Sequence, residues 1–198
     1  MNIDPNSAGP PARTHEDYYT ALYQAALTIS SSLELDEVLQ SVVTSITEAM
    51  QVKACLLRLL DPRTGQLALS AVHGLSDKYL AKGPVEVRFS PIDSEALSGT
   101  PVVMQDVRVD PRFQYQEAAR HEGIVSALCV PLEVRGNAIG IIRVYTSTPS
   151  TFHQDDIQFL SVLASLAALA IENANLYDNL KRSYDGVMDV LWGSGTHS

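Results

Sequence analysis

The chain has 198 residues, enough for one domain with flanking helices and a sizeable core. Apolar residues make up 45% and charged residues 19%, the balance of a globular domain, and the net charge of −9 argues against nucleic acid as a direct partner. The longest apolar stretch, 160–171, is interrupted by Ser161 and Ser165 and is too short to span a bilayer. Because the N-terminus also lacks the pattern of a secretory signal, we expect a cytoplasmic protein without a membrane partner.

Two cysteines occur, Cys55 and Cys129, and each lies inside an apolar run. Neither belongs to a C-x-x-C pair, the pattern of a metal site or of a redox dithiol. We therefore expect both to be small, buried core residues.

Two amphipathic helices are predicted near the N-terminus, after a tail at 1–13 that has too few apolar side chains to repay ordering. Thr14 is the N-cap candidate of the first helix, and Asp36 that of the second. The second helix has a broad apolar face over 38–50. The predicted buried stripe of the first helix consists of Tyr19, Leu22, Ala26, Ile29 and Leu33.

The middle of the chain is predicted to form a sheet. Apolar and β-branched runs bounded by turn residues indicate strands over 52–60, 67–73, 102–104, 124–134 and 138–146. The first two and the last two of these strands form hairpins. Short helices are expected near 92–97 and 116–121, within long connections of the kind that usually carry function.

The apolar period becomes helical over 154–192, a length well beyond that of an ordinary globular helix. One stripe suits packing on the domain itself and consists of Ile157, Leu160, Ala164, Ala167, Ile171 and Ala174. A second stripe has the three-four spacing of a coiled coil and consists of Leu163, Leu166, Ala170, Asn173, Tyr177, Leu180, Tyr184, Val187 and Leu191. Part of this second stripe has the alternative of packing inside the monomer. Its distal part, 175–192, is predicted to pair two copies, and 193–198 to form a flexible tail.

Three segments resemble the GAF domain family. The first is the loop 106–113, and the second is the closing hairpin, with Gly-Ile-x-Ser from 123, Val-Pro-Leu from 130 and Gly-x-x-Ile-Gly from 136. The third is the last helix, with Asp-Asp at 155 and Ala-Leu-Ala-Ile-Glu-Asn-Ala from 168. The resemblance implies a GAF domain over 14–180 with a GAF/PAS-like α+β fold. Its central antiparallel sheet carries the N- and C-terminal helices on one face and a loop-covered ligand pocket on the other.

Strand alternation predicts which side chains face that pocket, because residues two apart share a face of a sheet. Arg143 and Tyr145 fall on the face opposite the core set, and so does Arg58 on the first strand. The resemblance makes these strands neighbours, so that two guanidinium groups converge and favour a carboxylate or phosphate ligand. The alternative is that one arginine pairs with a loop acid such as Asp93 or Asp106, or reaches solvent.

Further candidate pocket residues come from the loops and the neighbouring strand, and they are Arg88, Phe113, Tyr115, His121 and Ala127. Phe113 and Tyr115 could instead fill space as hydrophobic plugs rather than recognise a ligand. A lone histidine is more often a surface or capping residue than a ligand to a metal.

The cysteines and the pocket residues also indicate whether the chain is an enzyme. One branch of the family contains free methionine sulfoxide reductases, whose chemistry needs a thiolate and a resolving thiol in the loops together with acidic groups. Here both cysteines lie in predicted strands, and the positions that match the pocket acids of that branch hold Ala127 and Arg143. We find no haem, bilin, cyclic-nucleotide or metal signature, so no catalytic residue is assigned and the cofactor is left unknown.

These patterns predict a non-catalytic, regulatory GAF domain that senses a small molecule, with ligand binding coupled to helix packing in a homodimer. The predicted dimer interface consists of Tyr177, Leu180, Tyr184, Val187 and Leu191. No output segment follows the helix, so either an effector protein acts in trans or the sequence is a fragment. The alternatives are a dimerisation scaffold whose pocket is filled by its own side chains, and a reductase of the kind described above.

Overall fold

The computed structural model describes residues 15–31, 34–81 and 85–193 of the chain. Its centre is a six-stranded antiparallel sheet with the strand order β3-β2-β1-β6-β5-β4. The strands are β1 (Ala54–Asp61), β2 (Gln66–His73), β3 (Val85–Glu86), β4 (Val102–Met104), β5 (Ser126–Val134) and β6 (Asn137–Thr146). The predicted α+β fold with a central antiparallel sheet is confirmed.

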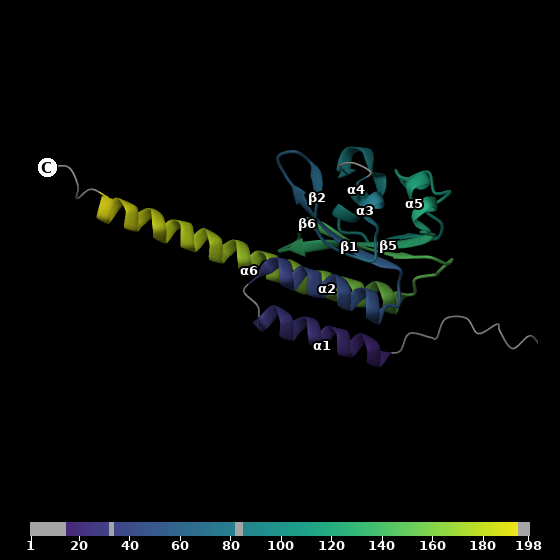
Figure 1. Cartoon of the computed structure of the whole chain (residues 1–198), viewed down its shortest axis with the longest axis horizontal. Coiled ribbons are helices and arrows are strands. Elements are labelled where there is room, and N and C mark those ends of the chain that lie inside the picture. The colour runs from purple at the N-terminus through teal and green to yellow at the C-terminus, as the bar shows by residue number, and fades with distance from the viewer. Residues whose placement is uncertain (1–14, 32–33, 82–84, 194–198) are drawn as a thin grey trace, which may run out of the picture.

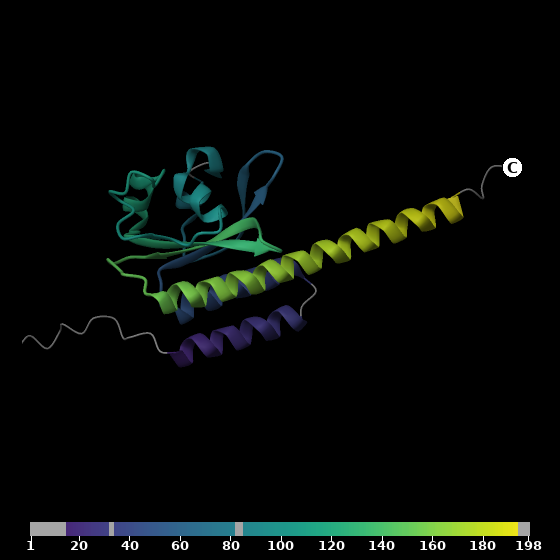
Figure 2. The ribbon, with the colours of Figure 1, turned by 180° about the vertical axis from the view of Figure 1, so that it is seen from behind.

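Long helices lie on one face of the sheet and short ones on the other (Figure 1). The long helices are α1 (His15–Ser31), α2 (Leu35–Ala49) and α6 (Gln154–Gly193). Both α2 and the first half of α6 pack directly on the strands, while α1 packs on these two helices from outside (Figure 2). The opposite face carries α3 (Asp77–Leu80), the 3-10 helix η1 (Val87–Phe89), α4 (Pro91–Leu97) and α5 (Gln116–Glu122).

Side chains alternate between two apolar layers along the strands. The layer under the long helices includes Cys55, Leu57, Ile142 and Val144. The layer under the short helices and loops includes Ala54, Leu56, Ile141 and Tyr145. Tyr145 lies on the face that strand alternation predicted for it, because the strand period of two depends only on local backbone geometry.

The helix α1 buries a different stripe from the predicted one. Tyr18 and Ala21 are buried, whereas Tyr19 is 72% exposed. The Tyr18 hydroxyl donates a 2.5 Å hydrogen bond to Asp156, and its ring stacks on Phe159 with the centroids 4.0 Å apart. The predicted stripe is therefore only partly right: Leu22 packs against the core, but Tyr18 and Ala25 are buried in place of Tyr19 and Ala26. Small alanines let α1 approach α2 and α6 closely.

The first half of α6 belongs to the domain core. Its buried side includes Leu160, Leu163, Ala167 and Ile171. Leu163 and Ala170, both predicted for the coiled-coil stripe, are buried inside the protomer. In this half of the helix the alternative of packing inside the monomer therefore holds, and the helix projects beyond the domain only further on (Figure 1).

Within the described residues, α6 is the one helix that passes a test of length and composition for crossing a membrane, over Gln154–Asp185. Of its most apolar window, 44% is buried inside the domain. The core helix of a soluble domain passes the same test. Packing against β5 and α2 accounts for the apolar composition of the first half of α6.

Some predictions fall outside the described residues. These are the flexible tails, the Thr14 cap, Leu33, and the side chains of Val187 and Leu191. The backbone of α6 is described as helix up to Gly193, one residue beyond the predicted end.

Gly140 marks the closest approach of β6 to β1. A Cβ atom at this position would lie 2.3 Å from the backbone oxygen of Arg58 and 3.0 Å from the Leu132 side chain. Because the backbone oxygen sits in a hydrogen-bonded ladder, we expect Gly140→Ala to lower the free energy of unfolding by about 2 kcal/mol. Urea unfolding of the two proteins measures this difference, and an unchanged midpoint would contradict it.

Candidate functional site

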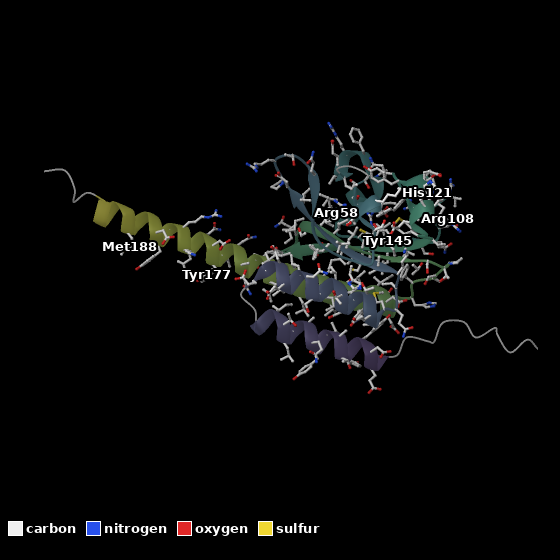
Figure 3. All side chains as sticks on the ribbon, viewed as in Figure 1. Arg58, Arg108, His121, Tyr145, Tyr177 and Met188 are labelled. Carbon is white, nitrogen blue, oxygen red and sulfur yellow. The ribbon has the colours of Figure 1, made fainter. Side chains whose placement is uncertain are left out.

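A small cavity lies on the loop face of the sheet. Its volume is about 20 Å³, room for about one water molecule. Five of the predicted pocket residues line it, namely Arg58, Phe113, Tyr115, Arg143 and Tyr145. Arg58 and Tyr145 lie on the central strands, beneath the layer of short helices and loops (Figure 3). The two arginines come close because β1 and β6 are paired, with Leu56 opposite Arg143.

Arg143 and Asp93 form a buried ion pair, with side chains that are 10% and 1% exposed. Nη2 of Arg143 donates to Oδ1 of Asp93 and lies 3.7 Å from Sγ of Cys129. Its Nε has no hydrogen-bond partner among the described residues. Burial lowers the pKa of Arg143, but the Asp93 carboxylate together with Cys129 and Tyr145 opposes burial, so that the pKa lies well above its usual value. The sequence left open whether Arg143 binds an anionic ligand or pairs with a loop acid, and the structure contains the pair with Asp93.

Arg58 is held by the neighbouring strand. Its Nη1 donates a 2.8 Å hydrogen bond to the backbone oxygen of Leu67 in β2. Burial lowers the pKa of Arg58, Tyr145 opposes this effect, and the nearby Arg143 charge adds to it. Among the described residues, Asp93 is the single carboxylate that lines the cavity. The cavity therefore contains two guanidinium groups and one carboxylate, an excess of positive charge.

Aromatic side chains close the cavity around these charges. The rings of Tyr79 and Tyr145 meet edge to face, with centroids 6.2 Å apart. Burial raises the pKa of both phenols, so they stay neutral and serve as hydrogen-bonding groups. The guanidinium carbon of Arg143 lies 5.9 Å from the centroid of the Phe113 ring, within reach of a cation–π contact.

Three predicted pocket residues do not line the cavity. The Arg88 side chain is 72% exposed and pairs with Glu86 at 2.6 Å. His121 is 67% exposed on α5, 3.3 Å from Glu117, and points away at the outer edge of the domain (Figure 3). Ala127 is fully buried in β5 opposite Tyr145, with no side-chain atom beyond Cβ to reach the cavity. Presence in a loop-rich segment was a poor guide to the direction of the Arg88 and His121 side chains.

The sequence interpretation missed Tyr79 and Ser90, which also line the cavity. Tyr79 lies in α3, a helix of four residues and too short for an apolar period. The signal that points to it is Ser76, which caps this turn by accepting a hydrogen bond from the Tyr79 amide at 3.2 Å. Ser90 precedes Pro91 at the start of α4 and is buried there.

The loop 106–113 is held by two Asp-x-Arg units. Arg108 donates side-chain hydrogen bonds of 2.8 and 2.7 Å to the two carboxylate oxygens of Asp106, and Arg112 makes the same fork with Asp110. Arg112 also lies 3.3 Å from Glu95 of α4. These pairs give the loop a defined shape that carries Phe113 into the wall of the cavity.

Acid stability is expected to depend on Asp106. Hydrogen bonds from Arg108 lower the pKa of Asp106 from 3.8 to about 2. Because the folded-state pKa is the lower one, this pair stabilises the fold fully above pH about 4, and the stabilisation is lost as the pH falls through about 2. We expect Asp106→Asn to have a flatter dependence of stability on pH over this range. Urea midpoints between pH 5 and 2 test this, and parallel curves would contradict it.

Both cysteines are buried, as predicted. Cys55 belongs to the core under the long helices and Cys129 to the core under the loops. Burial raises the pKa of the Cys129 thiol to about 11 and raises that of Cys55 as well. Neither thiol ionises near neutral pH, and the sheet separates them, so they do not form a nucleophile with a resolving partner.

Other parts of the described chain offer less defined sites. No group of three His, Cys, Asp or Glu side chains with the arrangement of a metal site occurs in 15–31, 34–81 and 85–193. A hollow of about 530 Å³ lies between the start of α2 and the middle of α6, bordered by Asp36 and Tyr177, and is open to solvent. Another of about 490 Å³ lies beside α5, where the Arg120 guanidinium is already bonded to the backbone oxygen of Arg108 at 2.6 Å.

Comparison with known proteins identifies the fold. The family model of the GAF domain matches residues 34–171 of the chain. The chain belongs to the GAF domain family. The match begins one residue before α2 and ends within the buried half of α6, so it covers the sheet, both of its faces and the cavity.

Two curated relatives of this GAF domain are regulatory proteins. The Nif-specific regulatory protein of Herbaspirillum seropedicae is 24% identical over 150 residues, which cover 73% of this chain and 28% of the relative. The methyl sulfide methyltransferase-associated sensor of Methanosarcina acetivorans is 26% identical over 176 residues, covering 83% of this chain and 18% of the sensor. The chain therefore spans less than a third of either relative.

Two solved structures share the fold. The GAF domain of a phosphoenolpyruvate-protein phosphotransferase from Coxiella burnetii has a TM-score of 0.74 and 22% identity, covering 83% of this chain and 98% of that domain. The free methionine-R-sulfoxide reductase of Neisseria meningitidis has a TM-score of 0.70 and 20% identity, with coverage of 86% and 98%. At these identities the likeness shows the fold alone, and the regulatory relatives indicate the broad role.

Proposed function

We propose that this GAF domain is a non-catalytic sensor that binds a small anionic molecule in the cavity beneath α4. The observation that carries the proposal is the pair of buried arginines, Arg58 and Arg143, which face one carboxylate within the part of the chain that the structure describes. Buried guanidinium groups are costly unless they are paired, so an excess of positive charge in a concave site favours an anion. The regulatory relatives support a sensing role.

Binding at the cavity is coupled to α6 through one layer of side chains. Arg143 and Tyr145 alternate along β6 with Ile142 and Val144, which pack in the core that α6 covers. Close-packed cores transmit small shifts of a strand because they have few voids to absorb them. A ligand that moves β6 therefore changes the packing of α6, provided that it binds the two arrangements with different affinity.

The proposed output is a cytoplasmic homodimer that passes the signal to an effector, either on the same chain or on a partner protein. Exposed apolar residues along α6 supply the pairing surface, and they are Val162, Leu169, Leu176, Tyr177, Leu180 and Tyr184. Their exposure in one protomer leaves apolar area for a second copy to cover.

One observation favours a second candidate function, a dimerisation scaffold with a self-filled pocket. The cavity holds no more than about one water molecule, and Asp93 already neutralises Arg143. A scaffold of this kind dimerises through α6 and responds to no metabolite.

A thermal-shift screen of a metabolite library separates the two functions. The sensor is expected to be stabilised by a few anionic compounds, and this effect is expected to disappear in Arg58→Gln and Arg143→Met. Arg88→Ala is the matched control, because Arg88 is exposed and does not line the cavity. A wild-type protein that responds to no compound, or compounds that stabilise all variants equally, would refute the sensor.

A further inference from the structure

The cavity is too small for the ligand that it is proposed to bind. A volume of about 20 Å³ accommodates one water molecule, and even the smallest carboxylate is larger. Part of the wall must therefore move on binding. The floor consists of β1 and β6, each hydrogen-bonded to a strand on both sides. The remaining wall comes from α3, α4 and the loop around Phe113 and Tyr115. Of these, α4 is seven residues long and carries the carboxylate bound to Arg143, so we take it as the wall that moves.

The moving wall contributes the carboxylate that occupies Arg143. Asp93 lies on the buried side of α4, beside Ile92 and Ala96. The contact uses one guanidinium nitrogen, Nη2, while the neighbouring Nε has no partner among the described residues. Guanidinium and carboxylate groups pair most strongly through two parallel hydrogen bonds. The pair with Asp93 is therefore incomplete, although the arginine is only 8% exposed.

We infer that the ligand is a small carboxylate that replaces the Asp93 side chain on Arg143 and thereby releases α4. The inference rests on the proposed sensing function and names the ligand class and the moving element. A free carboxylate is able to accept hydrogen bonds from both Nε and Nη2, whereas Asp93 is constrained by its helix. Asp93 regains its hydration on leaving, so the exchange keeps the charge of the cavity unchanged.

This exchange favours a carboxylate over a phosphate, because the departing Asp93 group carries one charge and two oxygens in a plane.

The exchange also connects the cavity to the loop 106–113. Glu95, on the exposed side of α4, pairs with Arg112 of this loop at 3.3 Å. Movement of α4 therefore disturbs the segment that places Phe113 in the cavity wall.

Calorimetric titration of the full chain with formate and acetate tests the exchange, with chloride at equal ionic strength as reference. Asp93→Asn is expected to bind acetate about tenfold more tightly than the wild type, because the internal competitor has lost its charge. Glu95→Gln is the matched control, since it neutralises an acid on the exposed side of the same helix, and it is expected to bind like the wild type. The double variant Asp93→Asn/Arg143→Met lacks the guanidinium that the carboxylate is inferred to bind, and it is expected to bind neither formate nor acetate.

Amide hydrogen exchange over 92–97 shows whether α4 is released. Saturating acetate is expected to accelerate exchange there in the wild type. If the wild type binds acetate and α4 keeps or gains protection, the inference is overturned while the sensing function stands. If neither protein binds formate or acetate, the inference fails, while the sensing function stands or falls with the thermal-shift screen. Binding by Asp93→Asn alone makes Asp93 a permanent occupant and also overturns the inference. Should Asp93→Asn not fold, the exchange measurement on the wild type decides.

Discussion

Arg143→Met is expected to lower the free energy of unfolding by about 3–5 kcal/mol, because it leaves the Asp93 carboxylate buried without its cation. Asp93→Leu is expected to cost a similar amount for the opposite reason, since the Arg143 charge then stays buried alone. Both side chains are nearly inaccessible to water, so solvent has little room to relieve either charge.

The double variant Asp93→Leu/Arg143→Met is expected to recover most of this loss. Removing both charges also removes the cost of dehydrating them, and the replacements are apolar groups of similar size. Urea unfolding of the four proteins forms a double-mutant cycle. Additive effects of the two substitutions would show that the two side chains do not interact, and would remove the basis for treating Asp93 as an internal anion. The exposed pair Arg88–Glu86 offers a comparison, for which a cycle is expected to give less than about 1 kcal/mol.

The positions of Arg58, Arg143 and Tyr145 were predictable because alternation along a strand is a local property of the backbone. The partner of Arg143 was not predictable with the same certainty. Asp93 is 50 residues away in sequence and lies on a short helix, so no period of the chain relates the two residues. The sequence left Asp93 and Asp106 as alternatives, and the structure pairs Asp106 with Arg108 instead. The pair Asp106–Arg108 is favoured by its spacing, because residues two apart reach each other within one turn of the loop.

The predicted domain-facing stripe of α6 is buried over Leu160, Ala164, Ala167 and Ile171, whereas part of the α1 stripe is displaced by one residue. Counting apolar residues at three-four spacing gives a large side chain more weight than an alanine, but close packing of helices favours the small one. In α1 the buried stripe runs through Ala21 and Ala25, and in α6 it includes Leu163 and Ala170. In the first half of α6 the exposed apolar residues are accordingly Val162 and Leu169. Solvent-facing stripes therefore had to be found from burial in the folded protomer.

The intact chain is expected to form a dimer that is lost on truncation after Ala174, because the exposed apolar residues further along α6 are then removed. Leu163 and Ala170 are buried in the protomer, so a different line of α6 residues faces a second copy. We call this line the seam. Val162, Leu169 and Leu176 are exposed and lie seven residues apart. Four residues after each of them come Leu166, Asn173 and Leu180, respectively. This three-four pattern is that of a coiled coil. It shares Leu166, Asn173 and Leu180 with the predicted stripe and replaces Leu163, Ala170 and Tyr177 by the residues one position earlier.

Adjacent substitutions distinguish the two seams, because neighbouring residues of a helix point about 100° apart. Leu176→Glu places a charge in the seam that follows from burial, and we expect it to raise the dimer dissociation constant about 100-fold. Tyr177→Glu is expected to have the smaller effect, about tenfold or less, because it lies at the border of that seam. Both residues are exposed in the protomer, 55% and 63%, so neither change disturbs the monomer core.

Asp178→Ala is the matched control, since residue 178 lies about 200° around the helix from Leu176 and faces away from the seam. Sedimentation equilibrium over a range of concentrations measures the wild type, the chain truncated after Ala174 and the three variants. A wild type that stays monomeric at every concentration refutes the homodimer, whatever the variants do. A larger effect of Tyr177→Glu than of Leu176→Glu instead restores the stripe through Tyr177, Leu180 and Tyr184. In that case the half of α6 that projects from the domain pairs without help from Val162 and Leu169, which lie on the half that packs on the domain. Ligand binding then reaches the dimer only if it bends or rotates α6 at the point where the helix leaves the domain.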